Sequence, residues 1–136
     1  MTRLALDTSA LIYLVEGSPG VRNQLAQRIG AALASPRGAV LASRLVRLEC
    51  RVKPLRDGNT ALLDKYDALF GSEEFMLADV TPAVLDRATE LRARHGFKTP
   101  DAIHLASAIE VGADHFLTGD ANLAKCPDLN VEVYAP

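Results

Sequence analysis

Apolar residues in this chain fall into short runs that alternate with longer segments of helical periodicity. The runs predict five short strands, at residues 3–6, 39–42, 75–78, 115–118 and 131–134. The segments between them predict helices over residues 8–16, 19–34, 43 to about 52, 57 or 59 to 70, 81–95 and 99–111. Ser43 and Thr99 are the expected N-caps of two of these helices, and Pro54 is the expected end of the first of them.

Short apolar strands that alternate with helices are typical of an open parallel sheet covered on both faces. The chain has 136 residues, and 49% of them are hydrophobic with no tryptophan, which favours one domain with an aliphatic core. We find no internal repeat, linker or low-complexity tract. The sequence therefore predicts a single α/β domain over residues 1–136.

Several absences narrow the functional classes. No apolar run approaches the ~18 residues of a membrane span, and only three apolar residues separate Arg3 from Asp7, so we expect neither a membrane anchor nor a signal peptide. Cys50 and Cys126 are far apart in sequence and are interpreted as reduced thiols, with a disulfide as the alternative. These features predict a cytoplasmic protein.

The net charge of −2 does not indicate binding to a polyanion by overall charge. The arginines nevertheless cluster, and one group shares a predicted helix with Glu49. Its members Arg44, Arg47 and Arg51 are candidates for phosphate contacts, with a solvated helix face as the alternative.

Four acids stand out by position. Asp7 ends the first apolar run, and Asp120 closely follows the fourth. Ligands of open parallel sheets bind at the carboxyl ends of the strands, so these two acids can share one rim if their strands are neighbours. Taken alone, Asp7 could be a helix cap and Asp120 an ordinary turn residue.

The other two acids belong to predicted helices. Glu49 has mostly apolar neighbours one helical turn away, and an acid buried there needs a partner or a metal. The alternative is a surface pair with Lys53. Asp101 follows Thr99-Pro100, where it complements the helix dipole and needs no further explanation. His104 lies one turn after Asp101 and is interpreted as a partly buried structural histidine.

If the fold brings these acids together, oxygen ligands would favour a hard cation such as Mg²⁺, and the absence of a Cys/His cluster argues against zinc. Divalent ions in such sites stabilise charge on a phosphate and activate water. The carboxylates therefore indicate a phosphodiesterase site.

Four segments then resemble the PIN-domain family, in particular the VapC-type toxins of bacterial and archaeal toxin–antitoxin pairs. They are Leu6–Leu11, Glu49 in its helix, Thr99–Ala106 and Phe116–Asp120, in the family's order and spacing. The resemblance spans essentially the whole chain and is most specific from Thr99 to Asp120.

The resemblance implies a three-layer α/β/α sandwich around a five-stranded parallel sheet, and an endoribonuclease that uses Mg²⁺, with Mn²⁺ as a possible substitute. It carries the family's catalytic acids onto Asp7, Glu49, Asp101 and Asp120. We expect Asp7, Asp101 and Asp120 to hold metal and Glu49 to orient the attacking water. Supporting positions are Thr8, Ser9, Thr118 and Asn122.

The implied partners are an RNA substrate, a cognate antitoxin protein and a second copy of the chain. A PIN-like RNA-binding or assembly module without catalysis is the alternative, and the complete set of acids argues against it. An aspartyl-phosphate phosphatase is a weaker third interpretation, because it would need a second aspartate at the position of Ser9.

Overall fold

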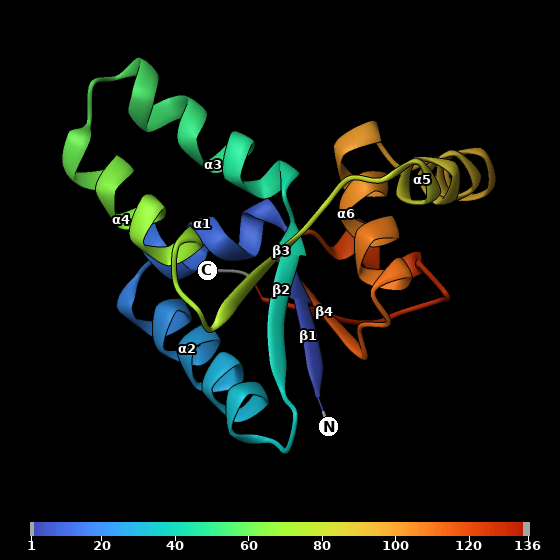
Figure 1. The fold of residues 1–136 in the computed structure, drawn as a ribbon, viewed down its shortest axis with the longest axis horizontal. Coiled ribbons are helices and arrows are strands. Elements are labelled where there is room, and N and C mark those ends of the chain that lie inside the picture. The colour runs from blue at the N-terminus through green and yellow to red at the C-terminus, as the bar shows by residue number, and fades with distance from the viewer. Residues whose placement is uncertain (1, 135–136) are drawn as a thin grey trace.

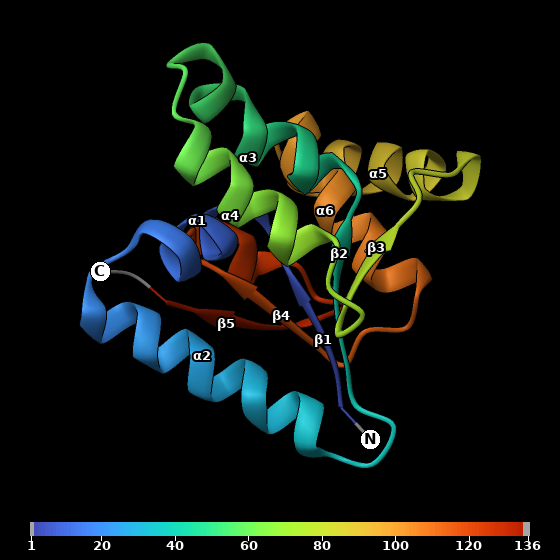
Figure 2. The ribbon, with the colours of Figure 1, turned by 60° about the vertical axis from the view of Figure 1, so that its left-hand side comes forward.

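Five parallel strands form the centre of the molecule, in the order β3-β2-β1-β4-β5 (Figures 1 and 2). The computed structural model describes residues 2–134, so residues 1, 135 and 136 of the predicted 1–136 domain lie outside it. The strands are β1 (Arg3–Leu6), β2 (Ala39–Ser43), β3 (Phe75–Ala78), β4 (His115–Thr118) and β5 (Asn130–Val133). Each agrees with a predicted strand to within one residue at either end.

Helices cover both faces of this sheet. They are α1 (Thr8–Glu16), α2 (Pro19–Ala34), α3 (Leu45–Arg56), α4 (Thr60–Phe70), α5 (Pro82–His95), α6 (Thr99–Glu110) and the 3-10 helix η1 (Ala121–Lys125). Helices α1 to α4 lie on one side and α5 and α6 on the other, and the two views agree on this division (Figures 1 and 2). The three-layer α/β/α sandwich with a five-stranded parallel sheet is thus confirmed.

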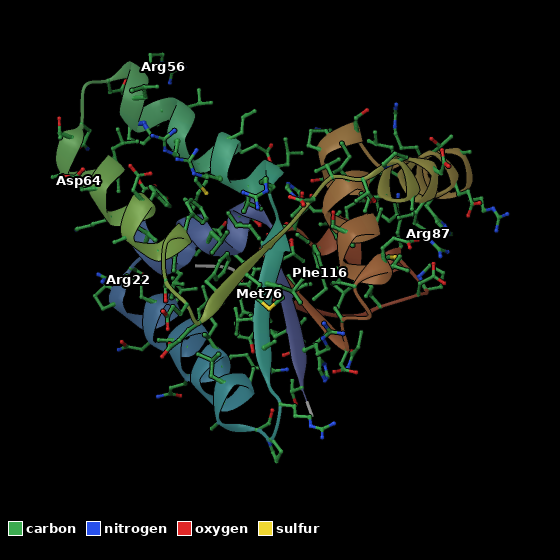
Figure 3. The ribbon with its side chains drawn as sticks, viewed as in Figure 1. Arg22, Arg56, Asp64, Met76, Arg87 and Phe116 are labelled. Atoms are coloured by element: carbon green, nitrogen blue, oxygen red, sulfur yellow. The ribbon has the colours of Figure 1, made fainter. Side chains whose placement is uncertain are left out.

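Alternate residues of each central strand supply the two cores. Leu4 and Leu6 of β1 pack with α1, α2 and α4, whereas Ala5 faces the core under α5 and α6. The same alternation places Leu117 in the first core and Phe116 in the second. Figure 3 shows Phe116 near the centre of the molecule, with the charged side chains it labels at the periphery. Burial on both faces explains why the strands are continuous apolar runs.

The predicted end of α3 at Pro54 was wrong, because the helix continues to Arg56. Pro54 has no N–H to donate, but the carbonyls of Lys53 and Leu55 still accept the N–H groups of Asp57 and Gly58. The carbonyl of Pro54 still accepts the N–H of Asn59 at 2.9 Å, and Gly58, at φ 65°, supplies the left-handed turn that ends the helix.

Two predicted N-caps were displaced by one residue. The N-cap of α3 is Arg44, although the hydroxyl of Ser43 does accept the N–H of Leu45 at 3.1 Å. The N-cap of α6 is Lys98, so Thr99 is the first helical residue. Helix η1, which the sequence did not predict, begins directly after Asp120.

Two further observations complete the fold. Cys50 and Cys126 are free and buried, as interpreted from the sequence. Within residues 2–134, every helix is too short or too polar to cross a lipid bilayer.

Candidate functional site

The four acids line one cavity at the carboxyl ends of the strands. Asp7 follows β1, Asp120 follows β4, Asp101 lies in the first turn of α6, and Glu49 lies in α3. Their cavity has a volume of about 260 Å³ and is also lined by Thr8, Ser9, Ile12 and His104. The strands point towards the edge of the sheet where α1, α3 and α6 begin (Figure 1). Residues distant in sequence therefore form a single acidic site.

Asp7 is the most enclosed of these acids, at 3% exposure. Its Oδ1 accepts hydrogen bonds from the hydroxyl of Ser9 at 2.7 Å and the backbone N–H of Ala10 at 3.0 Å, and its Oδ2 accepts one from the hydroxyl of Thr118 at 2.6 Å. The bond from Ala10 makes Asp7 the N-cap of α1. A buried carboxylate needs such donors, so capping and site formation are served by the same side chain.

Two hydroxyls join the ends of the neighbouring strands β1 and β4. Thr118 donates to Asp7 and accepts the backbone N–H of Asp120 at 3.0 Å. Ser9 likewise donates to Asp7 and accepts the backbone N–H of Gly119 at 2.8 Å. Each hydroxyl uses its donor on the acid and its acceptor on the next loop, which fixes Asp7 relative to Asp120.

Asp120 is exposed at the mouth of the cavity and caps η1. Its Oδ1 accepts the backbone N–H of Asn122 at 2.9 Å. Asn122 therefore contacts the site through its main chain.

Glu49 is bound by two donors from other helices. Its Oε1 accepts the hydroxyl of Thr8 at 2.7 Å, and Nε2 of His104 lies 2.6 Å from the same oxygen. Within residues 2–134, Glu49 forms no ion pair with Lys53, the alternative that the sequence left open. The hydrogen bond from His104 lowers the pKa of Glu49, and the bond from Thr8 acts in the same direction, against the effect of burial. Glu49 is thus held as a carboxylate.

Asp101 shows the opposite effect. Burial raises the pKa of Asp101, and the negative charges of Asp120 and Asp7 raise it further. Like charges in one cavity repel, so a positive ion between them would relieve the repulsion. All four acids offer oxygen, which fits a hard divalent cation such as Mg²⁺. In the described part of the chain, no three metal-ligating side chains stand close enough to form a ready cluster, so binding would require the carboxylates to approach one another.

His104 is the functional candidate that the sequence interpretation set aside. It is 3% exposed, not partly buried, and it lies on the cavity wall beside Glu49. The available signal was its place one helical turn after Asp101, which puts both side chains on the same face of α6. What the sequence did not show was that α3 would bring an acid to that face.

Arg47 and Arg51 lie on α3 and Arg44 is its N-cap, and none of these three candidate RNA-binding arginines lines the acidic cavity. Arg44 pairs with Asp79 at 2.7 Å, and Arg51 pairs with Asp67 at 2.8 Å. Arg47 is 4.0 Å from the same oxygen of Asp67. The arginines line a separate surface depression of about 450 Å³, together with apolar residues of the helix.

Comparison with known proteins gives a consistent result. The family model described as PIN domain matches residues 4–129. The fold resembles VapBC2 from Rickettsia felis bound to a promoter DNA fragment (TM-score 0.80, 14% identity, covering 98% of this chain and 99% of that chain). It also resembles a toxin–antitoxin complex from Klebsiella pneumoniae (TM-score 0.73, 21% identity, covering 98% of this chain and 99% of that chain).

A third similar structure is VapC20 of Mycobacterium tuberculosis, described as a sarcin-ricin loop cleaving toxin (TM-score 0.73, 22% identity, covering 96% of this chain and 98% of that chain). At these identities the likeness concerns the fold. A search of proteins with curated function finds no match.

Proposed function

This chain belongs to the PIN domain family, and from that premise we propose that it is a metal-dependent endoribonuclease that acts as the toxin of a toxin–antitoxin pair. The observation that carries the proposal is the convergence of Asp7, Glu49, Asp101 and Asp120 on one cavity at the carboxyl edge of the sheet. Structures of similar fold come from toxin–antitoxin complexes and include a toxin described as cleaving the sarcin-ricin loop, which supports the reaction class.

In this proposal Asp7, Asp101 and Asp120 hold Mg²⁺, or Mn²⁺ in its place. When bound, such an ion supplies positive charge that offsets the negative charge developing on the phosphate. Asp7 is positioned by Ser9 and Thr118, and Asp120 by the backbone of Asn122. These hydrogen bonds orient the two carboxylates before a cation binds, although the acids would still have to approach one another to share it.

Glu49 has a different task. Its lowered pKa keeps it ionised at neutral pH, so it can accept a hydrogen bond from water. In this proposal it orients the attacking water towards the phosphorus. Thr8 and His104 hold the carboxylate for this purpose.

RNA would approach along basic side chains outside the acidic cavity. We retain Arg44, Arg47 and Arg51 as candidates for phosphate contacts. The acidic partners of Arg44 and Arg47 do not exclude this role, because exposed ion pairs contribute little, whereas Arg51 is half-buried in its pair with Asp67. Substituting Arg47 and Arg51 should weaken RNA binding and flatten its dependence on salt concentration, and unchanged binding would remove this surface from the proposal.

An antitoxin is the implied protein partner, because a cell that makes an RNA-cleaving toxin must restrain it. A second cavity of about 410 Å³ lies among α1, α3 and α4 and shares Ile12 and Glu49 with the acidic cavity. An antitoxin segment in this groove could reach the acids and block them. We also propose a cytoplasmic location, because the RNA substrate is found in the cytoplasm. A homodimer completes the proposal.

The deciding experiment compares wild type with Asp7→Asn and Asp120→Asn. Asparagine keeps the capping function at both positions but removes the charge. The purified proteins are assayed on total RNA with Mg²⁺, with Mn²⁺ and with EDTA, and growth is followed after induction. Asp64→Asn is the matched control, because Asp64 is an exposed residue of α4 outside the acidic cavity.

We expect metal-dependent cleavage and growth arrest from wild type and the control only. Absence of metal-dependent cleavage by wild type would refute the nuclease function and favour the non-catalytic RNA-binding or assembly module. Equal cleavage by wild type and Asp7→Asn would refute the assigned site.

Millimolar Mg²⁺ should also raise the melting temperature of wild type, because an ion that binds only the folded state stabilises it. Asp101→Asn should reduce this shift. A melting temperature that does not respond to Mg²⁺ or Mn²⁺ would count against the metal site.

A further inference from the structure

The carboxylate of Glu49 is held between helices from opposite faces of the sheet. Thr8 is the first residue of α1, Glu49 lies in α3, and His104 lies in α6. The hydroxyl of Thr8 and Nε2 of His104 both meet Oε1 of Glu49, at 2.7 and 2.6 Å, and lie 3.3 Å from each other. Three helices thus converge on one carboxylate oxygen.

The second oxygen of Glu49 is left available. Among residues 2–134, Oε2 has no hydrogen-bond partner, and it is not enclosed. The side chain as a whole is 29% exposed, whereas that of His104 is 2% exposed. The two donors therefore occupy Oε1 and leave Oε2 as the atom that a ligand can reach.

The surroundings of His104 define which nitrogen carries its proton. A carboxylate oxygen only accepts, so Nε2 must carry a hydrogen to bond Oε1. The other nitrogen, Nδ1, is buried and has no partner among the described residues. A hydrogen there would be a buried donor without an acceptor, which is unfavourable. These partners assign the neutral Nε2–H tautomer.

This tautomer excludes two other roles for His104. Nε2 is already committed to Glu49 and offers no lone pair to a metal or to a proton. Nδ1 has a lone pair but is enclosed in the protein. His104 can therefore act on the reaction only through Glu49.

We propose that His104 is a positioning residue, whose Nε2–H fixes Oε1 of Glu49 so that Oε2 is presented to the attacking water. The role rests on the nuclease function proposed above. Without this bond the carboxylate can rotate about its last torsion and exchange its two oxygens. Thr8 alone would remain to oppose that rotation.

A first test concerns the hydrogen bond in the metal-free protein. Long-range proton–nitrogen NMR spectra distinguish the two imidazole tautomers and the doubly protonated ring. The chain has three histidines, and the signals of His104 are identified by their loss in His104→Gln. We expect that Nε2 carries a proton and Nδ1 does not, and that the chemical shift of the Nε2–H proton changes in Glu49→Gln. The Nδ1–H tautomer or a doubly protonated ring would overturn the proposal.

A second test separates positioning from a merely structural role. His104→Leu keeps an apolar side chain but removes the donor, and His104→Gln restores an N–H close to the place of Nε2. We expect kcat to fall about 10–100-fold in the leucine variant with KM for RNA unchanged, and most of the loss to be recovered in the glutamine variant. His95→Leu, on the last residue of α5, is the matched control.

Thermal unfolding shows whether each variant is folded at the assay temperature. If His104 only supports packing, the folded leucine and glutamine variants will have equal kcat, and this would overturn the proposal. If the leucine variant does not fold, the glutamine variant and the NMR result test the positioning role instead. A tautomer other than Nε2–H would refute this role. A kcat for His104→Gln as low as that of Glu49→Gln would refute it as well.

The outcomes also distinguish this inference from the proposed function. A wild type that cleaves no RNA with either metal refutes the nuclease function and the positioning role with it, while the NMR result separately establishes the hydrogen bond. A wild type and a leucine variant that cleave equally well refute only the role of His104.

Discussion

Replacing Thr118 with valine should remove the link between two acids while preserving the shape of the side chain. Thr118 is fully buried. Its hydroxyl donates to Oδ2 of Asp7 at 2.6 Å and accepts the backbone N–H of Asp120 at 3.0 Å. Valine has the same size but neither bond, so the substitution isolates the contribution of the hydroxyl.

The magnitude follows from the environment of each bond. Asp7 is buried and loses one of three donors, and a hydrogen bond to a charged group contributes about 1.5–3 kcal/mol. The N–H of Asp120 belongs to an exposed residue and is rehydrated at little cost. We expect the free energy of unfolding to fall by about 2–3 kcal/mol, which lowers the melting temperature by roughly 6–15 °C for a chain of this length.

The assay is urea and thermal unfolding at pH 7 in metal-free buffer. Thr118→Ser is the control, because it keeps the hydroxyl and loses only a methyl group, at a cost of about 1 kcal/mol. The reasoning is refuted if the valine variant is as stable as the serine variant. RNA cleavage by the valine variant, measured at a temperature where it is folded, should also fall, since Asp7 is no longer fixed relative to Asp120.

Three further substitutions test other parts of the site in the metal-free protein. Asp101→Asn should stabilise it at pH 7, because burial and neighbouring acids raise the pKa of Asp101. The wild type therefore loses stability as the pH rises above about 3.9 and Asp101 ionises in the folded state. A stability gain in the variant that persists at pH 3 would contradict this reasoning. Glu49→Gln should destabilise it at pH 7, because the hydrogen bond from His104 lowers the pKa of Glu49; melting curves should show the deficit shrinking as the pH falls below about 4.3, through the lowered folded pKa. Gly119→Ala would place a Cβ 2.3 Å from Cε2 of Tyr13, so we expect a loss of about 1–3 kcal/mol in unfolding experiments, and an unchanged melting temperature would show that the ring moves freely.

The shared rim of Asp7 and Asp120 shows what the apolar pattern could predict. A parallel sheet aligns the carboxyl ends of its strands, and both acids follow apolar runs. The pattern did not reveal which strands are neighbours. In the structure β1 pairs directly with β4, and Leu6 is level with Leu117, so the residues that follow can be joined by Thr118 and Ser9. Strand order depends on packing of the whole domain, which local periodicity does not encode.

The errors at helix ends have a related cause. Pro54 is a strong local stop signal, yet α3 continues two residues past it, and the turn that follows satisfies the last carbonyls of the helix. Glu49 was recognised as unusual because its helical neighbours are apolar. Its two hydrogen-bond partners were not recognised, because Thr8 and His104 belong to other helices that only the tertiary fold brings to Glu49.

The pKa of Glu49 is lowered and that of Asp101 is raised, and this contrast supports the division of roles proposed for the acids of the cavity. Thr8 and His104 hold Oε1 of Glu49 and stabilise its negative charge. The pKa of Asp101 is instead raised, chiefly by burial and then by the charges of Asp120 and Asp7. A cation beside Asp101 would relieve this repulsion, whereas Glu49 would keep its charge to orient water in the proposed mechanism. This asymmetry is the physical reason for proposing Asp7, Asp101 and Asp120 as the metal-holding group and Glu49 as the acid that orients the nucleophile.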